Sequence, residues 1–210
     1  MKNVLEITEK DVKKLFIEQR YEKLDVSDFK SQNKYEKLFD IDTISWPNIY
    51  KLPFDILCEN KVIDLQYRIV HRYIGTQHLL FKIGKSNSPN CESCMMYPET
   101  IEHLFFECFI VKNFWFKLIE LYSCFINLEI SLSCKDVILM YDNGNEFVST
   151  NINTLILYGK SFIYNCKMKN RNVNIDSFAK YVYPKLCVID HVNTKNKECL
   201  ALLKVFIESI

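Results

Sequence analysis

The chain has 210 residues, long enough to form one large or two small domains with a buried core. Hydrophobic residues make up 49% and charged residues 25%, a globular composition that excludes an intrinsically disordered chain. The formal net charge is +1, so the chain lacks the overall basic field that favours nucleic-acid binding. With only four Gly and five Pro to make turns, we expect a mainly α fold with long helices.

The first sixty residues predict an N-terminal helical extension. Thr8 can cap a first helix, and the polar segment 25–42 predicts a loop or a weak helix. Ser45 and Pro47 then indicate the start of another helix, with proline in its first turn. Between them, Trp46 is expected to anchor packing rather than bind a ligand.

The next segment is the most basic part of the chain. Residues 61–75 predict a helix, and Thr76 is expected to cap a short helix that Gly84 ends. Five cations between residues 61 and 90 face the single acid Asp64, which gives a net charge of +4. Cations beside tyrosines suit phosphate contact and base stacking, although a solvated helix face would have the same composition. The candidate nucleic-acid contacts are Lys61, Arg68, Arg72, Lys82 and Lys85.

Four metal-binding residues follow with the spacing C-x2-C-x8-H-x4-C: Cys91, Cys94, His103 and Cys108. Two cysteines separated by two residues can reach one ion from a tight turn, and a His and a Cys complete a tetrahedron suited to Zn²⁺. Four protein ligands leave no open position, so we expect one structural zinc ion rather than a catalytic one. The alternative is that these cysteines are structural without a metal, since the chain contains nine.

The spacing of the last two ligands constrains the local helix. Thr100 is a candidate N-cap that places His103 in the first turn. On one continuous α-helix, His103 and Cys108 would point about 140° apart. We therefore expect a short helix with a break or a loosened turn near residues 107–109, and a second helix from about Val111.

Residues 126–210 predict a C-terminal helical region. Ser133 is expected to cap a short helix, and a long helix is expected from Thr150 or Asn151. Gly159 would allow another helix to approach the long one closely, and Pro184 is expected to kink or divide a later helix. Together these patterns predict an extension at 1–60, a zinc-binding module at 61–125 and a helical region at 126–210.

The remaining cysteines and the terminal sequence bear on location. The chain begins without the apolar run of a signal peptide and contains no apolar stretch of about 18 residues, so we expect a soluble intracellular protein with no membrane partner. Six cysteines outside the motif are expected to be buried small hydrophobic residues in a reducing compartment. They are Cys58, Cys124, Cys134, Cys166, Cys187 and Cys199.

Five stretches between residues 65 and 115 combine a specific order and spacing: Leu65–Arg72, Leu80–Gly84, Ser88–Cys94, Glu99–Cys108 and Phe114–Trp115. Together they resemble the zinc-binding segment at the C-terminal end of reverse transcriptases of LINE-type (non-LTR) retrotransposons. The chain departs from that pattern at Phe109, where family members often carry proline.

The resemblance implies a non-catalytic zinc-binding module that helps a polymerase engage template RNA or target DNA, with nucleic acid and a reverse transcriptase polypeptide as partners. The paired aspartates of a polymerase are absent, because Asp142 has no second carboxylate beside it. We therefore expect neither an enzyme nor a small-molecule substrate.

Two alternatives to nucleic-acid engagement stay open, namely a protein-interaction or scaffold module and an inactive retroelement remnant. An exposed apolar patch around Phe105, Phe114 or Trp115 would favour the scaffold. A shared exposed face for Arg68, Arg72 and Lys82 would favour nucleic-acid binding.

Overall fold

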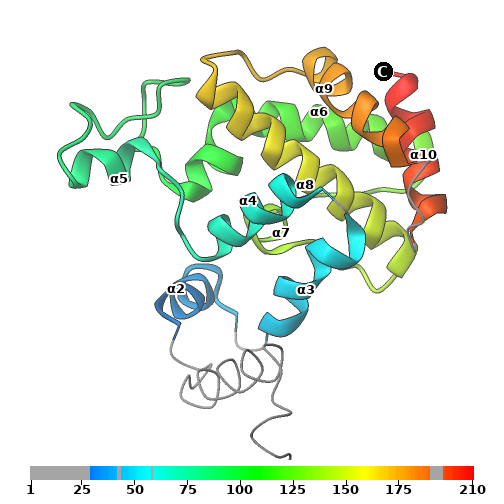
Figure 1. Ribbon diagram of the computed structural model, residues 1–210, viewed down its shortest axis with the longest axis horizontal. Coiled ribbons are helices and arrows are strands. Elements are labelled where there is room, and N and C mark those ends of the chain that lie inside the picture. The colour runs from blue at the N-terminus through cyan, green and yellow to red at the C-terminus, as the bar shows by residue number, and fades with distance from the viewer. Residues whose placement is uncertain (1–28, 42–43, 58, 190–195) are drawn as a thin grey trace, which may run out of the picture. The chain divides into compact units, whose positions relative to one another are not determined.

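The computed structural model describes residues 29–41, 44–57, 59–189 and 196–210 (Figure 1). The helix expected near Thr8 lies outside these residues. The chain divides into two units, Met1–Ile44 and Ser45–Ile210. The three-part division expected from the sequence stays a prediction.

The first unit contributes one described helix, α2 (Lys30–Phe39). Asp40 ends this helix in the left-handed conformation, with a φ of 51°, and its N–H donates to the Glu36 carbonyl. A helix therefore occupies most of the polar segment for which the sequence predicted a loop or a weak helix.

The second unit is built from helices, which confirms the predicted mainly α fold. Among its described residues the one extended pairing is an isolated antiparallel bridge between Asn90 and Pro98. None of the described helices is both long and apolar enough to cross a bilayer. The elements are α3 (Trp46–Ile56), α4 (Asn60–Val70), α5 (Gln77–Lys82), a π-helical turn η3 (His103–Glu107), α6 (Phe109–Ile126), α7 (Cys134–Leu139), α8 (Glu146–Met168), α9 (Ile175–Ile189) and α10 (Lys197–Glu208).

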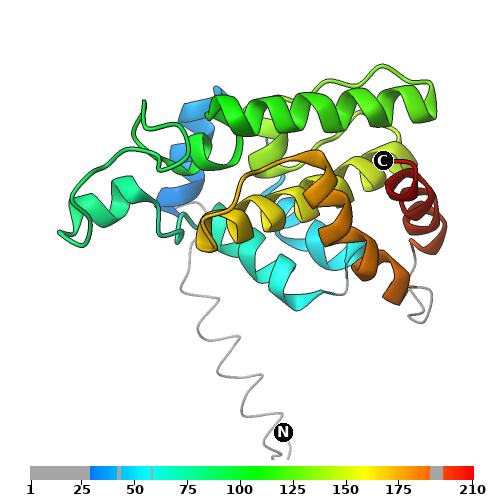
Figure 2. The same ribbon diagram turned by 90° about the horizontal axis from the view of Figure 1, so that it is seen from above.

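Helix α8 forms the centre of the second unit. Every residue from Thr150 through Lys160 is buried, as expected for a helix surrounded by other elements. It packs against α3, α4, α9 and α10, and also against η3. Figure 2 shows α6 along one side of α8, with α4 on the other. The helix begins at Glu146, several residues before the predicted start, because the Asn145 side chain accepts a hydrogen bond from the N–H of Val148 and caps it there.

A glycine and a tryptophan join α8 to α6. A Cβ atom on Gly159 would lie 2.3 Å from Cη2 of Trp115, so only glycine leaves room for the indole ring. The indole N–H of Trp115 also donates to the Phe105 carbonyl of η3 at 2.7 Å. The space at Gly159 is therefore filled by a side chain of α6 rather than by the closely approaching helix that the sequence predicted, and the bond to Phe105 ties the π-helical turn to the core.

Several helix boundaries follow the predicted caps. Thr76 Oγ1 accepts a hydrogen bond from the N–H of Leu79, and Gly84 follows α5 with a φ of 71°. Ser133 and Asp136 form a reciprocal capping box at α7. The sequence was wrong about α4, which ends at Val70 rather than near Gly75, because Arg72 has a φ of 60°. Pro184 lies inside α9 and does not divide it.

Candidate metal centre

The four predicted ligands lie together. The ligand atoms of Cys91, Cys94, His103 and Cys108 are all within 4.8 Å of one another. Cys94 Sγ lies 3.3 Å from His103 Nε2, which identifies Nε2 as the nitrogen that faces the cluster. Three sulfurs and one imidazole nitrogen at these separations fit one zinc ion.

A tight turn presents the first two cysteines. The Met95 N–H donates to the Cys91 carbonyl at 2.8 Å, and Met95 turns the chain with a φ of 59°. The chain then returns alongside Cys91, whose N–H donates to the Tyr97 carbonyl at 2.9 Å. Pro98 lies in this returning segment, opposite Asn90, at a position where the bridge does not need a backbone N–H.

The π-helical turn η3 presents His103 and is followed directly by Cys108. Thr100 caps the helix start, because its hydroxyl accepts the N–H of His103 at 3.1 Å. The Cys108 N–H then donates to the His103 carbonyl at 3.0 Å, which closes a turn between residues five apart. A π turn therefore brings together two side chains that an α-helix would separate. Cys108 then leaves the helix with a ψ of 128°, and α6 begins at Phe109. This confirms the predicted break.

The cysteines of the cluster differ in acidity. The pKa of the Cys91 thiol is lowered to about 4, first because the Cys108 thiol donates a hydrogen bond to it, and then because the N–H groups of Cys94 and Ser93 point at its sulfur. The pKa of Cys108 is raised by the same hydrogen bond and by burial. The thiols of Cys91 and Cys108 are joined by a hydrogen bond, and a divalent cation between the two sulfurs would take the place of the shared proton.

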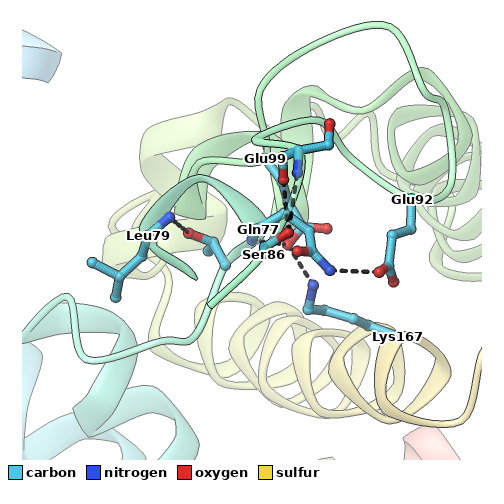
Figure 3. Close-up of polar contacts among 8 residues, drawn as sticks. Gln77, Leu79, Ser86, Glu92, Glu99 and Lys167 are labelled. Carbon is cyan, nitrogen blue, oxygen red and sulfur yellow. Dashed lines mark hydrogen bonds and ion pairs between the residues drawn. The ribbon is translucent and has the colours of Figure 1, made fainter. Parts of the chain in front are cut away.

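Two buried acids attach the cluster to the rest of the second unit. Glu99 is 2% exposed, and its carboxylate pairs with Lys167 of α8 and accepts the N–H of Gln77 at 2.8 Å (Figure 3). Glu102, next to His103, forms a bidentate pair with Arg72, with a shorter distance of 2.5 Å. Burial opposes ionisation of Glu102, but Arg72 outweighs it and holds the pKa of Glu102 below its usual value. Neither anchor was predicted from the sequence, although Glu99 precedes the cap residue Thr100 and Glu102 precedes the ligand His103.

The five predicted nucleic-acid contacts have different surroundings. Lys61, Lys82 and Lys85 are exposed. The Arg68 side chain is 36% exposed and pairs with Asp64 at 2.9 Å. Arg72 is 17% exposed and pairs with Glu102, so it does not share an exposed face with the other cations.

The remaining histidines and cysteines lie outside the metal centre. Among the described residues the metal-ligand cluster contains neither His71 nor His78. Cys166 and Cys199 are buried as expected, whereas Cys124 is exposed, which corrects the expectation for that residue. Cys134 and Cys187 are half-buried, and Cys58 lies outside the described residues.

The fold and the site together define a helical domain with a closed Cys₃His zinc site. The segment 91–108, which carries its four ligands, is called the knuckle below. The family model described as zinc-binding in reverse transcriptase matches residues 29–115, less than half of the chain. For these residues the match confirms the predicted resemblance to a zinc-binding segment of reverse transcriptases. The curated proteins and the solved structures that were compared include no match to the chain.

Proposed function

We propose that the chain is the non-catalytic zinc-binding module of a LINE-type reverse transcriptase and that it helps the polymerase engage template RNA or target DNA. The family match and the closed metal centre support a module held in shape by zinc. The matched model describes a zinc-binding region, not a polymerase. Engagement of nucleic acid therefore depends on the surface beside the knuckle.

The observation that carries this proposal is a set of cations on the elements that precede the metal ligands, of which the lysines are exposed and Arg68 is half-buried. Lys61 and Arg68 lie on α4, Lys82 ends α5, and Lys85 follows it. Cations of this kind attract phosphates although the whole chain is near neutral. Arg72 is not part of the proposed contact surface, because its guanidinium is largely buried in an ion pair with Glu102.

Exposed aromatic side chains lie on α4 and in the segment that follows it. Tyr67 is 50% exposed and Tyr73 is 72% exposed. Their ring centroids lie 4.2 Å and 6.0 Å from that of His71, which also stacks on Tyr50. Burial lowers the pKa of His71, which favours a neutral ring. Flat exposed rings are suited to base stacking.

The experiment is fluorescence anisotropy of labelled RNA and DNA with the zinc-loaded protein over a range of salt concentrations. We expect log K to fall linearly with log salt, and a Lys82→Ala/Lys85→Ala variant to reduce the slope by about 1.5, since each phosphate contact contributes roughly 0.7–0.9. Lys117→Ala/Lys180→Ala, which removes two exposed lysines from α6 and α9, is the control and should leave the slope unchanged. Absence of binding to both nucleic acids would contradict the proposal.

A scaffold that docks on the polymerase is the second candidate. Phe105, Phe114 and Trp115 are buried, so the apolar patch that would have favoured it is not formed by those residues. Exposed Met95 and Met96 at the tip of the knuckle are the observation that favours it instead. Met95→Ser/Met96→Ser should weaken capture of the polymerase without changing nucleic-acid affinity if this second role holds.

A further inference from the structure

A polar pocket lies among α4, α8 and α9, away from the zinc ligands. Its volume is 460 Å³, within the range of pockets that hold small organic groups. Leu65 and Met168 contribute apolar surface, and Tyr164 and Tyr181 contribute aromatic surface. None of the four ligands of the metal centre lines it.

Two cationic side chains lie over the aromatic rings that line the pocket. The Arg68 guanidinium lies over the ring of Tyr164, 5.7 Å from its centroid. Lys185 Nζ lies 4.9 Å from the centroid of Tyr181. The Tyr181 hydroxyl is 2.8 Å from Ser161 Oγ, which fixes its ring in the wall. Arginine planes and aromatic rings are the side chains on which unpaired bases stack.

The rim of the pocket carries side chains of both positive and negative charge. Lys61 and Arg68 are cations suited to phosphate, while Asp64 and Glu59 are carboxylates that can accept hydrogen bonds from the amino groups of bases. Arg68 pairs with Asp64, and Lys185 with Glu59, so each acid is held next to an aromatic wall. A ligand that matches this lining has an aromatic ring with amino groups and an attached anion.

We propose that this pocket receives the base of one unpaired nucleotide, so that the chain binds single-stranded nucleic acid in preference to duplex. This inference rests on the proposed nucleic-acid function and specifies its substrate. Tyr67, also on α4, is exposed and does not line the pocket, so the same helix offers an aromatic surface outside it. A base in a duplex is stacked and paired, and therefore cannot enter without being extruded.

The test uses the full zinc-loaded chain with 12-nucleotide DNA and RNA strands that contain 2-aminopurine, each as single strand and as duplex. Tyr164→Leu keeps apolar volume but removes the ring. Its matched control is Tyr183→Leu on α9, whose tyrosine is partly exposed and does not line this pocket. Arg68→Ala is a second pocket variant at a half-buried rim position, and it removes the cation that lies over Tyr164. Circular dichroism and zinc content establish that each variant folds.

We expect single strands to bind at least tenfold more tightly than duplex, with a change in 2-aminopurine fluorescence on binding. Tyr164→Leu and Arg68→Ala should each raise the Kd for single strands about tenfold, or ~1.4 kcal/mol, and Tyr183→Leu should not. Equal affinity for single strand and duplex, or an unchanged Kd in folded Tyr164→Leu, would overturn the pocket assignment while leaving the proposed function intact. Failure of the wild type to bind any of the strands would instead overturn both.

Discussion

At the residue scale, two arginines that are four positions apart have different roles. Arg72 neutralises the buried carboxylate of Glu102, whereas Arg68 pairs with the exposed Asp64. Removing one partner of a buried ion pair leaves an uncompensated charge, but an exposed pair contributes little. We predict that Arg72→Gln lowers the free energy of unfolding by about 3 kcal/mol, as measured by urea denaturation of the zinc-loaded protein.

Arg68→Gln is the matched control and should change the free energy of unfolding by no more than about 0.5 kcal/mol. Similar losses for the two variants would contradict the assignment of Arg72 to an internal role. The sequence could not separate the two residues, because it shows the helical spacing of the arginines but not that Arg72 meets an acid 30 residues further on.

A buried lysine provides a second prediction at this scale. Lys160 donates to the Val137 carbonyl at 2.7 Å and to the side chain of Gln66, and burial lowers its pKa well below 10.5. Between this lowered pKa and 10.5, Lys160 is neutral in the folded protein but protonated in the unfolded chain. The folded state therefore binds fewer protons than the unfolded chain in this pH range. The free energy of unfolding should therefore gain a contribution that grows as pH rises through this range.

Lys160→Met lacks the titrating amine and should lack this contribution. Urea denaturation of wild type and variant at pH 7, 8 and 9 would measure the difference between them, so that groups common to both cancel. We expect the stability of the wild type relative to the variant to increase with pH. A difference that stays constant or decreases would show that Lys160 does not titrate in this way.

At the scale of elements, the contact between α6 and α8 depends on the missing side chain of Gly159. Alanine normally favours a helix over glycine by about 1 kcal/mol, but here its Cβ would overlap the ring of Trp115. We predict that Gly159→Ala lowers the free energy of unfolding by about 1–3 kcal/mol, as measured by chemical denaturation. Gly75→Ala is the control, because a Cβ there meets nothing within 4 Å. Equal effects of the two substitutions would contradict the packing role.

Helix starts were predictable where a cap is local. Thr76, Thr100 and Ser133 each accept a hydrogen bond from an N–H three residues later, so a short stretch of sequence contains the signal. The end of α4 was not predictable in this way, because the conformation of Arg72 accompanies a contact with Glu102 that is distant in sequence.

The metal centre was largely predictable because its ligands fall within 18 residues. The spacing of His103 and Cys108 also indicated that a regular helix had to be interrupted between them. The form of the interruption, a π-helical turn whose Phe105 carbonyl bonds to Trp115, depends on packing against α6. The pocket depends on side chains from three helices, and no single stretch of the sequence encodes it.

At the scale of the whole molecule, the knuckle is joined to the rest of the second unit at several points. Glu99 bonds to α8 through Lys167, Glu102 to Arg72 after α4, and Phe105 to α6. A metal ion that holds the four ligands would therefore fix the positions of elements that carry none of them. Loss of the metal should affect helices well beyond the knuckle, because metal binding and folding are coupled in such sites.

The most direct test of this account is the zinc content per chain of wild type, Cys94→Ser and Cys124→Ser, with helical circular dichroism recorded before and after addition of a chelator. Cys124 is exposed and lies outside the cluster, so its substitution is the control. We predict one zinc per chain in wild type and Cys124→Ser, and loss of both zinc and helicity in Cys94→Ser and on chelation. A folded wild type that contains no zinc would contradict the assignment of these four residues as a structural zinc site.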